Sequence, residues 1–155
     1  CAAMAFKKGD IDGSVKFFDE AINLETDNAK KADNAYKAAS VLASAKKLSQ
    51  ARSYAQKAIS FNENFGAPYI LIAQLYAGNY KWNDEPALNK CTFFAAIDKL
   101  QRAKAVDPSV AEEANKLISS YSAYTPEAKD LFMLGYKAGD RITIGGWIGE
   151  TTTIR

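Results

Sequence analysis

Small and apolar residues recur along most of the chain at helical spacing, which predicts amphipathic α-helices that each bury one face. Three stretches, 9–28, 46–64 and 91–109, align with one another without gaps. Each contains two small residues seven positions apart, and these pairs are Ser14 and Ala21, Ala51 and Ala58, and Ala96 and Ala103. Because small residues let a neighbouring helix approach closely, the pattern predicts helices packed side by side.

The segments between these helices repeat as well. Residues 69–76 place Tyr, Ile, Ala and Tyr at the spacing W-x2-L-G-x2-Y, and residues 114–121 and 35–42 keep that spacing with other residues. The second and third of the aligned stretches are separated by a longer interval than the first two. This difference predicts an insertion at residues 78–90, where turn-forming residues and a proline indicate a loop.

The pattern resembles the tetratricopeptide repeat (TPR) over residues 1–121, most specifically where one helix ends as Ala96-x3-Leu100-x2-Ala103-x4-Pro108. The resemblance implies an all-α fold, a right-handed α-solenoid of helical hairpins. In such a fold, the first helix of each unit lines a concave groove that binds a peptide or a protein segment. We expect residues 1–124 to form the repeats.

The resemblance also implies which residues face the groove. They are expected on three helices, as Asp33, Tyr36 and Ser40, then Ile70, Gln74 and Ala77, and last Glu112, Asn115 and Ser119. Lys37 is the only cation near them, so the Lys, Arg and Asn set with which some TPR domains clamp a terminal carboxylate is not present. Apolar and neutral hydrogen-bonding contacts are expected instead.

Tyr80 and Trp82 stand out because they lie in the polar insertion, where helical periodicity does not require apolar residues. Two interpretations remain open. The pair is an exposed contact for a partner, or the loop folds back and buries both rings against the helices.

After Tyr121 the pattern changes, and we expect residues 125–155 to complete the same compact unit. Thr125-Pro126-Glu127 predicts a helix start, residues 131–134 supply its apolar face, and Gly135 can end it. Two β-prone runs around Gly145-Gly146 predict a β-hairpin. A lone hairpin is marginally stable in water, so this one should pack on the last helices through Trp147 and its isoleucines.

Two functions follow from this organisation. The first is a scaffold that binds a partner in the groove. The alternative is a structural assembly or dimerisation module, in which the hairpin adds a strand to another chain and forms a homo-oligomer. Residues 106–118 together with 145–155 also resemble exported TPR proteins of Bacteroidetes-type bacteria, which implies a periplasmic or cell-envelope location. The first ten residues resemble the end of a helix, so we expect the chain to be part of a longer protein.

Composition narrows the function further. A net charge of +2 without a dense basic stripe argues against nucleic acid as a partner, and no apolar run approaches the ~18 residues of a membrane span. The chain has no histidine, the commonest general base and metal ligand, and adjacent Asp84 and Glu85 do not fix a catalytic carboxyl separation. We therefore expect no enzyme, cofactor or metal. Cys1 and Cys91 are expected as buried free thiols or, alternatively, as a bridge.

Overall fold

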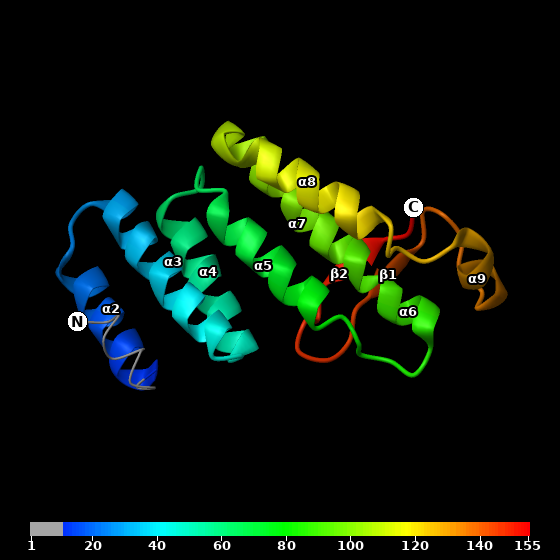
Figure 1. Ribbon diagram of the computed structural model, residues 1–155, viewed down its shortest axis with the longest axis horizontal. Coiled ribbons are helices and arrows are strands. Elements are labelled where there is room, and N and C mark those ends of the chain that lie inside the picture. Colours follow the sequence, from blue (N-terminus) through cyan, green and yellow to red (C-terminus); the bar gives the residue numbers. More distant parts are fainter. Residues whose placement is uncertain (1–10) are drawn as a thin grey trace.

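The computed structural model describes residues 11–155, so the expected helix end over the first ten residues lies outside the described part of the chain. The longer helices follow one another in an array. They are α2 (Ile11–Leu24), α3 (Asn28–Ser44), α4 (Leu48–Phe61), α5 (Ala67–Gly78), α7 (Thr92–Val106) and α8 (Ala111–Ser122). Each packs against the next and they lie side by side in chain order (Figure 1). This confirms an all-α, TPR-like α-solenoid.

Short elements complete the chain. They are α6 (Pro86–Lys90), the 3-10 helix η1 (Pro108–Val110), α9 (Ala128–Met133) and the strands β1 (Arg141–Thr143) and β2 (Thr151–Thr153). Figure 1 places α9 at one end of the array and the strands beside α7. The C-terminal hairpin is therefore present, as the sequence predicts.

Small residues explain how closely the helices pack. Two of the predicted pairs of small residues are fully buried, namely Ala51 and Ala58 of α4 and Ala96 and Ala103 of α7. On α3 the buried face consists of Ala32, Ala35, Ala38, Ala39 and Leu42. With so little side-chain volume between them, α2 and α4 both contact α3 closely.

Local chemistry fixes where individual helices begin and end. The side chain of Asp27 accepts a hydrogen bond from the main-chain nitrogen of Ala29 at 2.9 Å, which caps α3. At the other end, Lys46 has a φ of 61° and turns the chain out of the helix. Gly66 precedes α5, and a Cβ atom there would lie 2.6 Å from Val110 and 2.8 Å from Asp107. Only glycine allows that close approach between the two turns.

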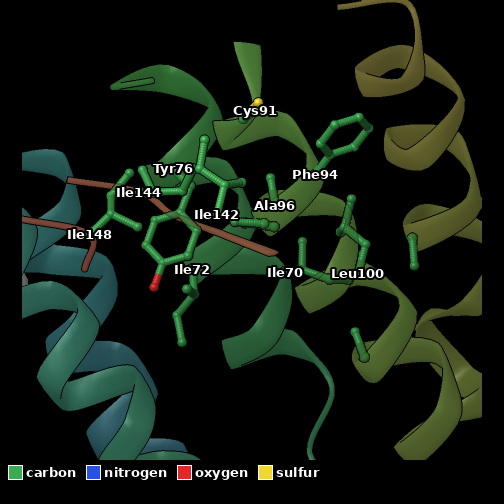
Figure 2. Packing of buried hydrophobic residues seen from close by; sticks show 14 of the residues in the cluster. Ile70, Ile72, Tyr76, Cys91, Phe94, Ala96, Leu100, Ile142, Ile144 and Ile148 are labelled. Atoms are coloured by element: carbon green, nitrogen blue, oxygen red, sulfur yellow. The ribbon is translucent and has the colours of Figure 1, made fainter. Parts of the chain in front are cut away.

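The largest core cluster joins α5 and α7 to the hairpin. Ile72, Tyr76 and Leu100 are fully buried, and the isoleucines of the hairpin region pack on the same cluster (Figure 2). Those isoleucines are Ile142, Ile144, Ile148 and Ile154. The hairpin is stable because it shares the core of the helical array and does not stand alone.

The connection between the strands differs from the predicted tight turn at Gly145-Gly146. The strands pair antiparallel with Ile142 opposite Thr152, and residues 144–150 connect them. Both Ile144 and Ile148 are buried, so the chain makes a wider excursion into the core before it returns. Burial of two isoleucines outweighs the local preference for a two-residue turn.

Two other boundaries were predicted wrongly. The expected insertion loop 78–90 is partly helical, because Pro86 starts α6 and Glu85 accepts a hydrogen bond from the nitrogen of Ala87 at 3.5 Å. The final helix starts at Ala128 and not at Thr125, whose hydroxyl donates to the oxygen of Ser122 at 2.8 Å. The hydroxyl is therefore used to close the preceding helix.

The apolar face expected on the final helix is also only partly buried. In α9, Leu131 is 1% exposed, whereas Phe132 and Met133 are 74% and 85% exposed. A helix of this length has room for few buried positions, and Leu131 occupies the one that faces the main cluster.

Candidate functional site

A cavity of about 450 Å³ lies where the C-terminal ends of α5 and α8 meet the start of α7. We call it the aromatic cavity. Its lining residues are Gln74, Ala77, Gly78, Tyr80, Lys90, Phe93, Tyr121 and Tyr124. Apolar surface dominates this lining, and Lys90 is the only lining residue between positions 11 and 155 that is charged at neutral pH.

Three tyrosine rings surround Phe93 in the aromatic cavity. The ring centroid of Phe93 lies 5.1 Å from that of Tyr80, 5.8 Å from Tyr121 and 5.5 Å from Tyr124. Phe93 is 6% exposed and forms the floor, whereas Tyr124 is 58% exposed at the rim. Burial raises the pKa of Tyr121, so this phenol is neutral at physiological pH.

Hydrogen bonds hold the loop that carries Tyr80. The main-chain oxygen of Tyr80 accepts a hydrogen bond from the hydroxyl of Thr92 at 2.9 Å. Further along, the nitrogens of Trp82 and Asn83 both donate to the side-chain oxygen of Asn89, each at 2.8 Å. The amide of Asn89 donates back to the oxygen of Asn83 at 2.7 Å. Asn89 is buried, and both its side-chain oxygen and its side-chain nitrogen are hydrogen-bonded to the loop, so the loop has a defined position beside the cavity.

The structure brings two predicted groove residues and one predicted loop residue to this cavity. Gln74, Ala77 and Tyr80 line it, and the side chain of Gln74 is exposed at its edge. One prediction was wrong, and one open alternative is decided. Ile70 is 3% exposed and packs in the main core, because α5 has neighbours on several faces. Trp82 is half-buried against the hairpin, so the loop folds back as in the second interpretation of this pair.

The predicted residues on α3 lie away from the aromatic cavity. Asp33 is exposed and forms an ion pair with Lys37 at 3.0 Å. The ring of Tyr36 packs edge-on against Phe65 with centroids 5.4 Å apart. The hydroxyl of Ser40 donates a hydrogen bond to the main-chain oxygen of Tyr36 at 3.1 Å. These polar groups therefore interact within their own part of the array.

On α8, the predicted residues are exposed but do not line the cavity. Glu112 pairs with Lys116 at 3.8 Å, and Asn115 accepts a hydrogen bond from Lys104 at 2.8 Å. Ser119 is exposed on the same helix. The residue that α8 contributes to the cavity is Tyr121, which the sequence pattern placed among the repeat-defining core positions.

Sequence reasoning missed Phe93, Tyr121, Tyr124 and Lys90 as site residues. One usable signal was present, because Tyr121 and Tyr124 are two aromatic residues three positions apart, a spacing that favours one shared face. Phe93 and Lys90 carried no such signal. The burial of Phe93 and the exposure of Lys90 both depend on how α6 and α7 meet.

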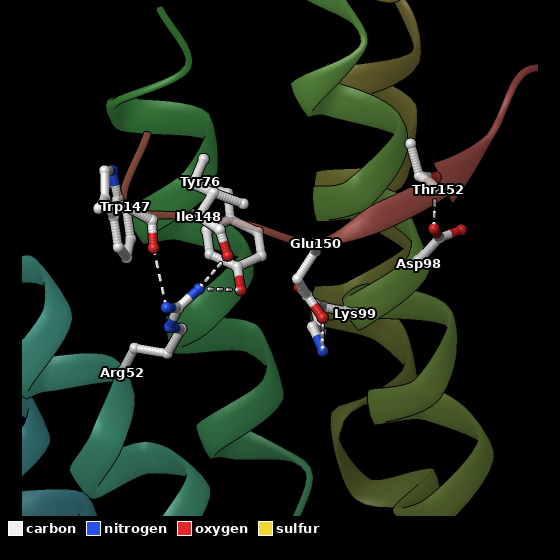
Figure 3. Close-up of polar contacts among 8 residues, drawn as sticks. All are labelled: Arg52, Tyr76, Asp98, Lys99, Trp147, Ile148, Glu150 and Thr152. Carbon is white, nitrogen blue, oxygen red and sulfur yellow. Dashed lines mark hydrogen bonds and ion pairs between the residues drawn. The ribbon is translucent and has the colours of Figure 1, made fainter. Parts of the chain in front are cut away.

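A second set of polar contacts ties the hairpin to α4 and α5 (Figure 3). The guanidinium of Arg52 donates to the main-chain oxygens of Ile148 at 2.5 Å and Trp147 at 2.8 Å. It also donates to the hydroxyl of Tyr76 at 3.1 Å. Burial, with a smaller effect from nearby Glu150, raises the pKa of Tyr76. Its neutral hydroxyl is available to accept this bond.

The hairpin is held to α7 in the same way. Lys99 forms an ion pair with Glu150 at 2.8 Å, and Asp98 accepts a hydrogen bond from Thr152 at 2.6 Å. Asp98 also pairs with Arg155. The hairpin therefore bridges α4 and α7 across one face of α5, through charged contacts on both sides (Figure 3).

Cys91 shows no sign of reactivity. It is a free thiol, fully buried, and burial raises its pKa to about 11. The thiolate, which is the reactive form, is therefore scarce at neutral pH. The alternative of a bridge involves Cys1, which lies outside the described residues.

Residues 11–155 contain no group of three or more cysteine, aspartate or glutamate side chains arranged to hold a metal ion. Within the same range, none of the helices combines the length and the apolar character that crossing a membrane requires.

No protein-family model matches the chain, and no curated protein matches it in sequence. Among solved structures, the chain is similar to one described as the TPR2B-domain:pHsp70-complex of yeast Sti1. The TM-score is 0.59 with 23% sequence identity, over 79% of this chain and 90% of that chain. At this identity the similarity shows the fold, a TPR-type array of helical hairpins.

Proposed function

We propose that this chain is a non-catalytic protein-interaction module that binds a peptide, or a segment of another protein, along a groove lined by α3, α5 and α8. The observation that carries the proposal is the aromatic cavity. Its volume of about 450 Å³ lies within the range of ligand pockets, and its wall is mainly apolar. The similar yeast domain is described in a complex with pHsp70, which supports an interaction role for the fold.

The chemistry of the cavity suits one bulky apolar side chain of the bound segment. Such a side chain would rest on Phe93 between Tyr80 and Tyr124, and each ring would lose solvent contact on binding. Tyrosine is enriched at interaction hot spots because it contributes a large contact area with few rotatable bonds. Gln74 at the edge offers both a donor and an acceptor to the main chain of the segment.

The test begins with peptides selected from a random displayed library on the wild-type chain. Their affinity is then measured for Tyr124→Ala and for Phe132→Ala. Both residues are exposed aromatics, but only Tyr124 lines the cavity. Loss of a hot-spot ring lowers affinity by about tenfold or more, so Tyr124→Ala should weaken binding by that factor. Phe132→Ala should leave the affinity unchanged.

Selected peptides that bind both variants as tightly as the wild type would show that the cavity is not the site. Far-ultraviolet circular dichroism of both variants checks that helix content is retained. Gln74→Ala supplies a second, smaller change at the cavity edge, and we expect it to weaken the same peptides by a few-fold.

One observation favours the second candidate function, assembly of two copies through the C-terminal region. Phe132 and Met133 at the end of α9, together with Leu134 directly after it, form an exposed apolar cluster. Among the described residues, β1 pairs with β2 only, so its other edge makes no strand pairing. A strand edge can pair antiparallel with the same edge of a second copy and so form a symmetric dimer.

Deletion of residues 141–155 cannot test assembly, because it would uncover the core around Ile72 and Tyr76. The variant Phe132→Ser/Met133→Ser removes the exposed cluster and leaves that core intact. A molar mass from light scattering that is twice the chain mass for the wild type, and equal to the chain mass for the variant, would support assembly. A single-chain mass for both would contradict it. A periplasmic or envelope location stays a prediction, which cell fractionation can test.

A further inference from the structure

The C-terminal hairpin lies directly behind the loop that forms one wall of the aromatic cavity. A Cβ atom added to Gly145 would lie 2.8 Å from Cε3 and 3.3 Å from Cζ3 of Trp82. The indole ring therefore rests on the backbone of Gly145. The φ of Gly145 is not positive, unlike that of Gly146 at 65°. Glycine at position 145 is required by the contact with Trp82 and not by backbone conformation.

Trp82 is part of the same short loop as the cavity residue Tyr80. Its indole nitrogen donates to the oxygen of Leu88 at 3.1 Å, and its main-chain nitrogen donates to Asn89. Tyr80 lies two residues earlier, with its ring against Phe93. A displacement of the indole therefore moves the chain segment that carries Tyr80.

The hairpin cannot move aside to absorb such a displacement. Ile144 and Ile148, on either side of Gly145, are buried in the main core. Arg52 holds the oxygens of Trp147 and Ile148, and the ring of Tyr76 packs edge-on against Trp147 with centroids 5.5 Å apart. Gly145 is therefore fixed in its contact with Trp82, and we expect the loop that carries Tyr80 and Trp82 to move instead.

We infer that the C-terminal hairpin positions the wall of the aromatic cavity, with Trp82 as the positioning residue that transmits the location of Gly145 to Tyr80. The hairpin and the cavity lie on opposite faces of α5. Tyr76 contacts the hairpin, whereas Gln74, two residues away and about 200° around the helix, lines the cavity. The effect on ligand affinity rests on the proposed function, but the effect on the position of Tyr80 does not.

The test compares four variants, with ring-labelled tyrosine and phenylalanine observed by NMR. Gly145→Ala places a methyl group against the indole. Trp82→Phe removes the fused ring that carries Cε3 and Cζ3, and Gly145→Ala/Trp82→Phe combines both changes. Thr151→Ala is the control, because it removes the exposed Thr143–Thr151 hydroxyl contact of 2.8 Å elsewhere in the hairpin.

Gly145→Ala should shift the Tyr80 ring resonances and weaken the Tyr80–Phe93 cross-peaks, whereas Thr151→Ala should not. With a selected peptide whose binding depends on Tyr124, Gly145→Ala should lower affinity about fivefold, because preorganisation of the cavity is lost. The double variant should recover affinity to within about twofold of Trp82→Phe alone.

The two proposals fail in different ways. If no selected peptide depends on Tyr124, the proposed function is wrong, and the ring resonances still decide the inference. If Gly145→Ala shifts Tyr80 no more than Thr151→Ala does, the hairpin does not position the cavity wall. The same conclusion follows if a cavity-dependent peptide binds Gly145→Ala as tightly as the wild type.

Discussion

Arg52 of α4 donates a hydrogen bond of 2.5 Å to the main-chain oxygen of Ile148, which lies 96 residues later in the chain. The same guanidinium lies over the ring of Trp147, 5.1 Å from its centroid. The side chain of Arg52 therefore donates hydrogen bonds to main-chain oxygens in the segment that connects β1 and β2. It also packs on Trp147, the aromatic residue of that segment. Charged hydrogen bonds and cation–π contacts are stronger when partly shielded from water than on a fully exposed surface.

Replacement of Arg52 by alanine should destabilise the fold. Two main-chain oxygens, of Trp147 and Ile148, lose their charged donor, and we expect the free energy of unfolding to fall by about 2–3 kcal/mol. Urea denaturation measures the change. Lys116→Ala is the control, because its ion pair with Glu112 is exposed and should contribute less than about 0.5 kcal/mol. Equal stability of both variants would contradict the role of Arg52.

Two neighbouring residues of α9 should respond very differently to truncation. Leu131 is 1% exposed in the main core, so Leu131→Ala leaves a cavity and should cost about 2–4 kcal/mol in the free energy of unfolding. Phe132 is largely exposed, and Phe132→Ala should change stability by less than about 0.5 kcal/mol. Thermal denaturation measures both changes. A larger loss of stability for Phe132→Ala than for Leu131→Ala would show that α9 packs through the face that carries Phe132.

The carboxylate of Asp107 should make stability depend on acid pH. It accepts hydrogen bonds from the hydroxyl of Ser109 at 2.6 Å and from the nitrogen of Gly66 at 3.0 Å, and these bonds lower its pKa. A lowered pKa gives stability that is present above the unfolded-state value of about 3.9 and is lost as pH falls through the folded-state value.

We therefore expect Asp107→Asn to be less stable than the wild type at neutral pH, and this deficit should shrink below about pH 4. Urea unfolding at several pH values measures the deficit. A deficit for Asp107→Asn that is constant across this range would show that the carboxylate charge is not what matters.

Tyr54 should give the opposite dependence at high pH. Burial, followed by its hydrogen bonds of 2.8 Å to both side-chain oxygens of Asp19, raises the pKa of Tyr54 to about 12. The neutral phenol thus stabilises the fold below its unfolded-state pKa of about 10, and this stabilisation is lost as pH rises toward 12.

Tyr54→Phe should therefore be less stable than the wild type at pH about 8, and the difference should narrow between about pH 10 and 12. Phenolate absorbance titration of the two proteins provides a second measurement, in which the wild type should show one additional late-titrating tyrosine. The absence of that late step would contradict the contact with Asp19.

The array of helices was predictable because its signal is local. Small residues at helical spacing, such as Ala51 with Ala58, identify a packed face whatever the neighbouring helix is. The hairpin was predictable as an element from its β-prone runs, but its turn was not. Burial of Ile144 and Ile148 depends on the shape of the core that the hairpin joins, which no local pattern contains.

The candidate site was less predictable for the same reason. Ile70 and Gln74 lie one helical turn apart, yet one is buried and the other is exposed at the cavity. The difference arises from the helices that surround α5. Phe93 and Tyr124 meet only after α7 and α8 stack, so their contact cannot be inferred from their separate segments.

The contact between Arg52 and Ile148 has a consequence for how the molecule unfolds. In a plain helical array each unit contacts only its neighbours, so terminal units can open one by one. Here the last residues of the chain fasten α4 to α7, so α4, α5 and α7 must open together. The segment that includes α2 and α3 lies outside this closure. Amide hydrogen exchange should therefore show graded protection in α2 and α3, and one common opening free energy for α4, α5 and α7.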